Sequence, residues 1–232
     1  MEELIEILKK FEEERKKKIV DGKWININKS KEEAVADCFY PCAKEILCNG
    51  YFLVNNKYII DLGAIELYYH EENGAIKDYA MYHIPERYQS PKIEGVVKIE
   101  KTLPYFEFGS LNLHQSGVDV TFEKENEYRA SFLIRAYRVL ELSKDGKYPE
   151  NNYTKYDVHS THIFDDMFYK GYPTKIAWVN YIKKGVTIDQ NRDYRKNLKK
   201  KDLIEGSINT FEETDQRKWQ FKIKGLEVNN AK

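Results

Sequence analysis

The start of the chain places apolar residues with the period of a helix. Leu4, Ile5, Leu8 and Phe11 recur three or four positions apart among charged side chains. Residues at these spacings lie on one face of a helix. Residues 2–18 are therefore predicted to form an amphipathic helix, which we expect to dock on the rest of the protein or on a partner.

A second helix is predicted from residue 30 to residue 47. Ser30 precedes Glu33 by three positions, which is the spacing of a capping box, and apolar residues then follow at helical period as far as Leu47. An Asn-Gly pair at residues 49–50 ends the pattern.

The middle and the end of the chain mostly alternate with the period of two that is typical of strands. Two strands joined at Asn55-Asn56 are predicted, with further strands at Phe108–Phe122, 128–142 and 217–228 and a short helix at 163–171. Helices that flank a run of neighbouring strands predict an α+β fold, a single compact domain with a curved, largely antiparallel sheet.

Length and composition agree with one main domain. The 232 residues are 41% hydrophobic, enough for one substantial core. We expect an N-terminal helix and linker at residues 1–28 and an α+β domain at residues 29–232. Because 38 basic residues balance 38 acidic ones, no overall field indicates a nucleic-acid or membrane partner.

The start of the chain lacks a long apolar stretch, and no later run reaches the length of a membrane span. We therefore expect a soluble, cytoplasmic protein without a membrane partner. Cys38, Cys42 and Cys48 lie in one short segment without the spacing of a zinc site, which predicts three reduced thiols.

Two charged residues stand in segments that otherwise have the pattern of a core. Glu66 lies between Ile65 and Leu67, and Arg135 follows an apolar run in the later strand. Burying a charge is costly unless it is paired or functional. Glu66 can be a solvent-facing acid, a structural partner of Arg135, or part of a site shared with it.

A metal-dependent alternative uses the histidines. His70, His83 and His114 could join Glu66 and Asp119 as zinc or iron ligands. The sequence has no helical His-Glu pattern to support such a site, no nucleophile elbow and no phosphate-binding glycine loop. We therefore expect neither a metal nor another cofactor.

One stretch carries a local excess of positive charge. Between Lys183 and Lys201 eight basic residues accompany only two acidic ones, with Tyr194 among them. Such a stretch is either a solvated surface or a set of phosphate contacts. The candidate contacts to a nucleic-acid backbone are Lys196, Lys199, Lys200 and Lys201.

Several short motifs, in order, resemble the methylpurine-DNA glycosylase family, also called alkyladenine DNA glycosylases. In GAIELYY, Glu66 and Tyr68 match the family's E-x-Y strand, and DYAMYH ends in His83 as the family's next stretch ends in histidine. GSLNLH places His114 where the family has a pocket tyrosine, and FLIRA matches with Arg135. WQFKIKG is similar to a strand near the family's C-terminus. The resemblance covers residues 34–225.

The resemblance implies a fold like the C-terminal domain of formyltransferases and a monofunctional DNA glycosylase. Such an enzyme flips a damaged or modified base out of double-stranded DNA and hydrolyses its N-glycosidic bond. Glu66 would activate the water, and Arg135 would orient Glu66 or the water. The residues implied in base binding are Tyr68, His83, His114, Ser116 and Asp119.

Three other functions remain open from the sequence. The chain could be a catalytically inactive module of this kind that binds nucleic acid or a nucleotide. It could be the metal-dependent hydrolase described above, or a protein-interaction module that uses its N-terminal helix. The base recognised and the oligomeric state are not encoded in any motif.

Overall fold

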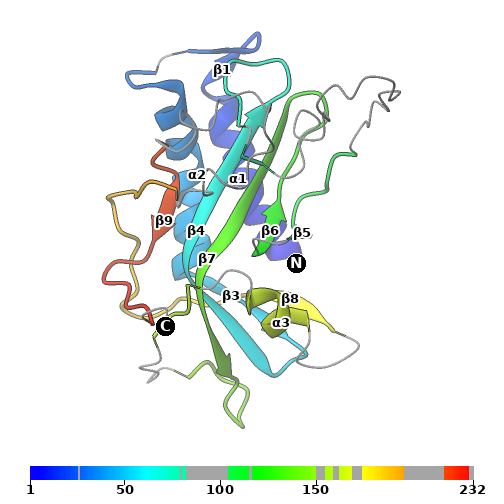
Figure 1. The fold of residues 1–232 in the computed structure, drawn as a ribbon, viewed down its shortest axis with the longest axis vertical. Helices are drawn as coiled ribbons and strands as arrows, with labels where there is room; N and C mark the ends of the chain where they lie inside the picture. Colours follow the sequence, from blue (N-terminus) through cyan, green and yellow to red (C-terminus); the bar gives the residue numbers. More distant parts are fainter. Residues whose placement is uncertain are drawn as a thin grey trace, which may run out of the picture.

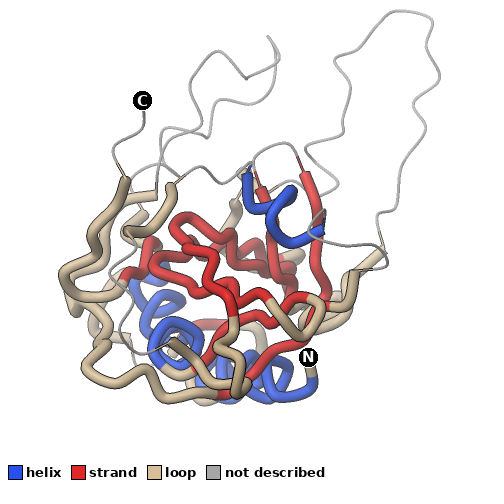
Figure 2. The backbone as a smooth tube through the Cα atoms, turned by 90° about the horizontal axis from the view of Figure 1, so that it is seen from below, coloured by secondary structure: helices blue, strands red, loops and turns tan. Residues whose placement is uncertain are grey.

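Two long helices cover one face of a sheet (Figures 1 and 2). The computed structural model describes residues 1–25, 27–78, 80–81, 104–114, 117–149, 155–158, 162–168, 174–195 and 217–229. Helix α1 (Glu2–Lys16) packs against helix α2 (Lys31–Cys48), and both predicted helices are confirmed within two residues at each end.

The capping box predicted at the start of α2 is present. The backbone N–H of Glu33 donates to Oγ of Ser30 at 3.2 Å, and the backbone N–H of Ser30 lies 3.4 Å from Oε2 of Glu33. Each side chain thereby satisfies a backbone donor that a helix start leaves unpaired.

In the described residues seven strands form one sheet, in the order β5-β6-β7-β4-β3-β8 with β9 also paired to β4. Neighbouring strands in this sheet run antiparallel, which confirms the predicted α+β fold with a curved antiparallel sheet flanked by helices. The strands are β3 (Gly50–Val54), β4 (Tyr58–Glu71), β5 (Ser110–His114), β6 (Gly117–Thr121), β7 (Tyr128–Glu141), β8 (Ile176–Asn180) and β9 (Gln220–Lys222). A small hairpin, β1 (Ile19–Val20) and β2 (Lys23–Trp24), follows α1.

Two asparagines form the turn between β3 and β4. Asn55 and Asn56 have φ of 53° and 54°, the left-handed conformation that a tight hairpin turn needs, and they join β3 to β4 as predicted. The segment Phe108–Phe122 forms two strands instead of one. Its interruption lies where β5 ends at His114 and β6 begins at Gly117, which pair with each other.

The two faces of the sheet differ in chemistry. On β4, Ile65, Leu67 and Tyr69 belong to the main core, which also contains Phe11 of α1 and Phe39 of α2. The rings of Phe11 and Tyr69 lie 5.7 Å apart. Because side chains alternate along a strand, Glu66 and Tyr68 face the other side of the sheet.

The short helix α3 (His162–Phe168) lies above this other face (Figure 2), beside β6. It confirms the short helix predicted at residues 163–171. No helix in the described part of the chain is long and apolar enough to cross a membrane.

Candidate active site

A buried carboxylate stands at the centre of the face opposite α1 and α2. Glu66 is fully buried. Nε and Nη2 of Arg135 both lie 2.6 Å from its Oε2. Of the three alternatives that the sequence leaves open, burial excludes the solvent-facing acid, and Glu66 forms an ion pair with Arg135.

Two more side chains bind Glu66. The hydroxyl of Tyr68 donates to Oε2 at 3.0 Å and accepts a hydrogen bond from Nη2 of Arg135 at 3.2 Å. The amide of Gln220 donates to Oε1 at 3.2 Å. Three strands, β4, β7 and β9, thus hold one carboxylate in a defined orientation.

The charge state of this group is set by its surroundings. Burial and the nearby Glu66 carboxylate raise the pKa of Tyr68, so its hydroxyl stays protonated. Burial alone would lower the pKa of Arg135, but Tyr68 and Glu66 outweigh it and the pKa of Arg135 is raised. Arg135 is therefore a permanent cation beside the carboxylate.

An irregularity in the sheet positions Arg135. The pairing of β4 with β7 passes from Ala136 to Ile134 in β7, so Arg135 is an extra residue in the register, and Gly63 is skipped in the same way in β4. Such bulges bend a strand and re-aim a side chain. Two bulges one step apart restore the overall register and direct the guanidinium towards Glu66.

A row of residues crosses the sheet at the level of Glu66. Asp119 of β6 lies opposite Leu133 of β7, which lies opposite Glu66, which in turn lies opposite Gln220. Two strand spacings, about 10 Å, separate the backbones of Asp119 and Glu66. The row therefore presents two buried carboxylates on one face with an apolar residue between them.

His114 lies beside the second carboxylate. Its Nε2 is 3.1 Å from Oδ2 of Asp119, and both side chains are more than nine-tenths buried. The resemblance gave His114 a stacking role, and the structure adds this contact with Asp119.

A salt bridge holds another segment over the same face. Arg195 donates from Nη1 and Nη2 to the two oxygens of Asp78, at 2.7 and 3.2 Å. Its guanidinium carbon lies 4.6 Å from the centre of the Tyr68 ring. Ala80 and Met81 then pack with Tyr68 and Leu133 in a small apolar cluster.

The basic stretch divides into two parts. In its described part, Lys183 is bound to Asp61 at 2.7 Å, Arg192 to Asp37 at 2.7 Å, and Arg195 to Asp78. These three basic side chains therefore form ion pairs within the fold. The candidate backbone contacts Lys196, Lys199, Lys200 and Lys201 lie outside the described residues, as do His83 and Ser116.

Metal binding is the alternative role for these acids and histidines. Within the part of the chain that the structure describes, no three His, Cys, Asp or Glu side chains are grouped so that they could hold a metal ion. The proposed ligand His83 lies outside it.

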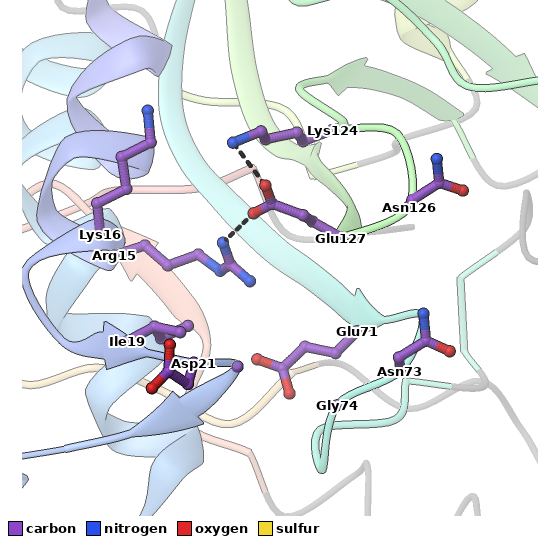
Figure 3. Close-up of a pocket in the computed structure, with 11 residues that line it drawn as sticks. Arg15, Lys16, Ile19, Asp21, Glu71, Asn73, Gly74, Lys124, Asn126 and Glu127 are labelled. Atoms are coloured by element: carbon purple, nitrogen blue, oxygen red, sulfur yellow. Dashed lines mark hydrogen bonds and ion pairs between the residues drawn. The ribbon is translucent and has the colours of Figure 1, made fainter.

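A pocket of about 360 Å³ opens elsewhere, at the end of α1 (Figure 3). Arg15 reaches into it between the helix and the sheet, donating to Glu127 at 2.9 Å and to Tyr69 at 2.6 Å. Glu71 lines it from the end of β4. Tyr69 lies on the helix-covered face, so this pocket is separate from the site of Glu66.

Sequence reasoning missed Gln220, which binds Glu66, and Asp78, which binds Arg195. Gln220 could have been found, because it stands between the alternating core residues Trp219 and Phe221 and must face the other side of β9. Asp78 gives no such signal, since its partner Arg195 is 117 residues away in the sequence.

Comparison with models of protein families, with curated proteins and with solved structures found no match for this chain. The resemblance to methylpurine-DNA glycosylases, and the formyltransferase-like fold it implies, therefore stay predictions. The fold and the site define an α+β protein with a buried Glu-Arg-Tyr group on the sheet face opposite its two long helices.

Proposed function

We propose that this chain is a DNA glycosylase that flips a modified or damaged base out of the duplex and hydrolyses its N-glycosidic bond. The observation that carries the proposal is the Glu66 carboxylate, fully buried in contact with Arg135 and Tyr68. A buried carboxylate that an arginine and a tyrosine hold in one orientation is an arrangement found at catalytic sites.

In the proposed reaction Glu66 takes a proton from a water molecule. The water oxygen forms a bond to the anomeric carbon of the sugar, while the bond from that carbon to the base nitrogen breaks and its electron pair leaves with the base. Positive charge grows on the sugar in the transition state, and the negative charge of Glu66 offsets it. The base is finally protonated from solvent, which needs no metal or other cofactor.

The surrounding residues would act by positioning. Arg135 and Tyr68 hold one oxygen of Glu66 and Gln220 holds the other, so the carboxylate does not need to reorganise during the reaction. The resemblance assigns Tyr68, His83 and His114 to stacking on the base, each contact worth about 1–3 kcal/mol. It assigns Ser116 to the place vacated by the flipped nucleotide.

Contact with the DNA backbone is assigned to Lys196, Lys199, Lys200 and Lys201. Tyr194, which precedes them, is more than half exposed, with Lys218 5.2 Å from its ring centre.

Further, we place the protein in the cytoplasm. The three free, buried cysteines support this, because free thiols are typical of reducing compartments.

A second candidate is a module of the same fold that binds a nucleotide or nucleic acid without catalysis. One observation favours it: both oxygens of Glu66 already accept hydrogen bonds from the protein. A carboxylate bound in this way can serve the fold alone, as the partner of a buried arginine.

A base-release assay separates the two candidates. Purified protein is incubated in excess with duplexes that carry alkylated, deaminated, oxidised or otherwise modified bases, and free bases are identified by mass spectrometry. The glycosylase proposal predicts release of at least one base, with an abasic site left in the DNA. Tight binding without release would favour the binding module, and neither binding nor release would contradict both.

A further inference from the structure

Two buried polar atoms near Glu66 have no hydrogen-bond partner among the residues that the structure describes. They are Oδ1 of Asp119 and Oγ of Ser131, whose residues are 3% and 1% exposed. Buried polar groups in folded proteins are almost always hydrogen-bonded, and leaving one unsatisfied is costly. Two such atoms close together indicate a place where a ligand or water supplies the missing partners.

Both atoms lie on the sheet face that carries Glu66. Asp119 is opposite Leu133, and Ser131 is two residues from Leu133 on the same strand, so all three side chains share this face. Ser131 is also opposite Tyr68, and Leu133 is opposite Glu66. The unsatisfied atoms therefore border the apolar cluster of Tyr68 and Leu133, on the side away from Gln220.

The other oxygen of Asp119 is already engaged. Oδ2 lies 3.1 Å from Nε2 of His114 across the β5–β6 pair, which fixes the carboxylate and leaves Oδ1 to meet a ligand. A carboxylate oxygen accepts hydrogen bonds and repels carbonyl oxygens, whereas a serine hydroxyl can donate or accept. Together the two atoms match an amino group next to a ring nitrogen.

We propose that Asp119 and Ser131 read the edge of the flipped base and select bases that carry an exocyclic amino group. Oδ1 of Asp119 accepts from the amino group, and the hydroxyl of Ser131 donates to the neighbouring ring nitrogen. This inference rests on the proposed glycosylase function and names its substrate class: adenine-like or cytosine-like bases, in preference to their oxo counterparts.

The position of Glu66 fits this arrangement. Asp119 and Glu66 flank Leu133 at about two strand spacings. A base lying across Leu133 with its amino edge at Asp119 would have its sugar towards Glu66. The atoms that identify the base and the carboxylate that activates the attacking water would then lie at opposite ends of one row.

The test compares bases that differ only in the amino group. Oligonucleotide duplexes contain adenine or hypoxanthine, and 5-methylcytosine or thymine, each placed opposite an abasic site so that the cost of opening a base pair is the same. Binding is measured by fluorescence anisotropy with Glu66→Gln protein, and release with the wild-type protein. We expect the amino member of each pair to bind about tenfold more tightly or better, in line with the usual discrimination by base-edge hydrogen bonds.

Three variants in the Glu66→Gln background complete the experiment. Asp119→Asn should abolish the amino preference, because an amide can donate as well as accept. Ser131→Ala should weaken binding of both members and keep their order. Asp145→Asn, in an exposed turn, is the control and should change nothing. Melting curves verify that each variant is folded, and if Asp119→Asn does not fold, Asp119→Ser replaces it.

The outcomes separate this inference from the proposed function. Base release without any amino preference would overturn the inference and leave the glycosylase standing. An amino preference that Asp119 controls, without release of any base, would support the inference for a binding module and remove the enzyme. Equal binding of both members of each pair, or no binding at all, would overturn the inference.

Discussion

Two buried carboxylates on strand β4, Glu66 and Asp61, show how differently one strand can use the same kind of group. Asp61 is also fully buried. It accepts hydrogen bonds from Lys183 at 2.7 Å, Arg138 at 2.8 Å, and the hydroxyls of Tyr148 and Tyr156 at 2.9 Å each. Asp61 thus has two cationic partners in the fold. Glu66 pairs with Arg135 on the sheet face that also carries Asp119 and Ser131.

The pH dependence of stability follows from Asp61. Burial alone would raise its pKa, but Lys183 and Arg138 outweigh burial and lower it below the usual 3.8. A carboxyl whose pKa is lower in the folded state stabilises the protein above its unfolded pKa, and this contribution is lost as the pH falls through the folded value.

Asp61→Asn should therefore lower the free energy of unfolding at pH 7 by about 3–5 kcal/mol, since it leaves two buried cations without their anion. The difference from the wild type should shrink below about pH 4, where Asp61 of the unfolded wild-type chain starts to take up a proton while Asp61 of the folded protein is still ionised. Urea unfolding between pH 3 and pH 7 measures both curves. A difference that stays constant over this range would contradict the assignment.

At the scale of elements, the sequence predicts those whose pattern is local. The helical period of Leu4, Leu8 and Phe11, the capping box at Ser30, and the turn at Asn55-Asn56 are each set by residues a few positions apart, and each is confirmed. Strand β8 was missed, because its residues acquire strand geometry only by pairing with β3.

The candidate site was predictable to a smaller extent. Glu66 and Arg135 break apolar runs and could be singled out from the sequence. The contact between them depends on the bulges at Gly63 and Arg135. No local pattern in the sequence predicts these bulges. The contacts of Asp78 with Arg195 and of Glu66 with Gln220 join residues more than 100 positions apart, so they follow only from the folded sheet.

Helix α2 makes a specific prediction about its cysteines. Cys38, Cys42 and Cys48 are free thiols, as predicted from their spacing, and the structure buries all three. Burial raises the pKa of Cys38 to about 11 and that of Cys42 to about 12, and it also raises that of Cys48. Because the thiolate is the reactive form, all three should react slowly with a disulfide reagent in the native protein at pH 8.

Thiol titration tests this directly. In denaturant three thiols per chain should react at once. In the native protein the thiols should react only as fast as unfolding exposes them. Fewer than three thiols after denaturation would mean that a cysteine is modified. Rapid reaction of the native protein would show that α2 is not packed as described.

The basic stretch at residues 196–201 predicts the response of DNA binding to salt. Changing Lys196, Lys199, Lys200 and Lys201 to Gln should weaken binding of all sequences alike and flatten the plot of log affinity against log salt. The slope should fall by nearly one for each phosphate that the variant no longer binds.

A matched variant controls for net charge. Lys9, Lys10, Lys16 and Lys17 on α1 and just after it are changed to Gln together, which removes the same charge from another part of the molecule. This variant should keep most of the affinity and the slope. Equal effects of the two variants would mean that general charge, and not this stretch, attracts the DNA.

At the scale of the whole molecule, one face of the sheet carries the hydrophobic core and the other carries the residues of the proposed active site. Its helix-covered face contains the aromatic core around Phe11, Phe39 and Tyr69. Its other face carries the buried Glu66 and the mostly buried Arg135, on the neighbouring strands β4 and β7 (Figure 1). Although the net charge of the chain is zero, an ion pair lies on one face of the sheet. The proposal assigns that surface to the flipped base.

Glu66→Gln tests this account most directly. The amide keeps the size of the side chain and can still accept from Arg135, and Gln220 can rotate its own amide to accept from the new one. The change therefore opens no cavity. It does remove the group that takes the proton from water, and it removes the negative charge. Asp61→Asn is the matched control, since it neutralises a buried carboxylate five residues away on the same strand.

The measurement is the single-turnover rate of base release, on the duplex that the wild-type protein cleaves fastest, with the melting temperature taken on the same preparations. The account predicts that Glu66→Gln lowers the rate per folded molecule by about 10²–10⁴. Asp61→Asn should melt earlier and keep the wild-type rate. If Glu66→Gln melts earlier yet keeps its rate, Glu66 serves the fold and the central claim is contradicted.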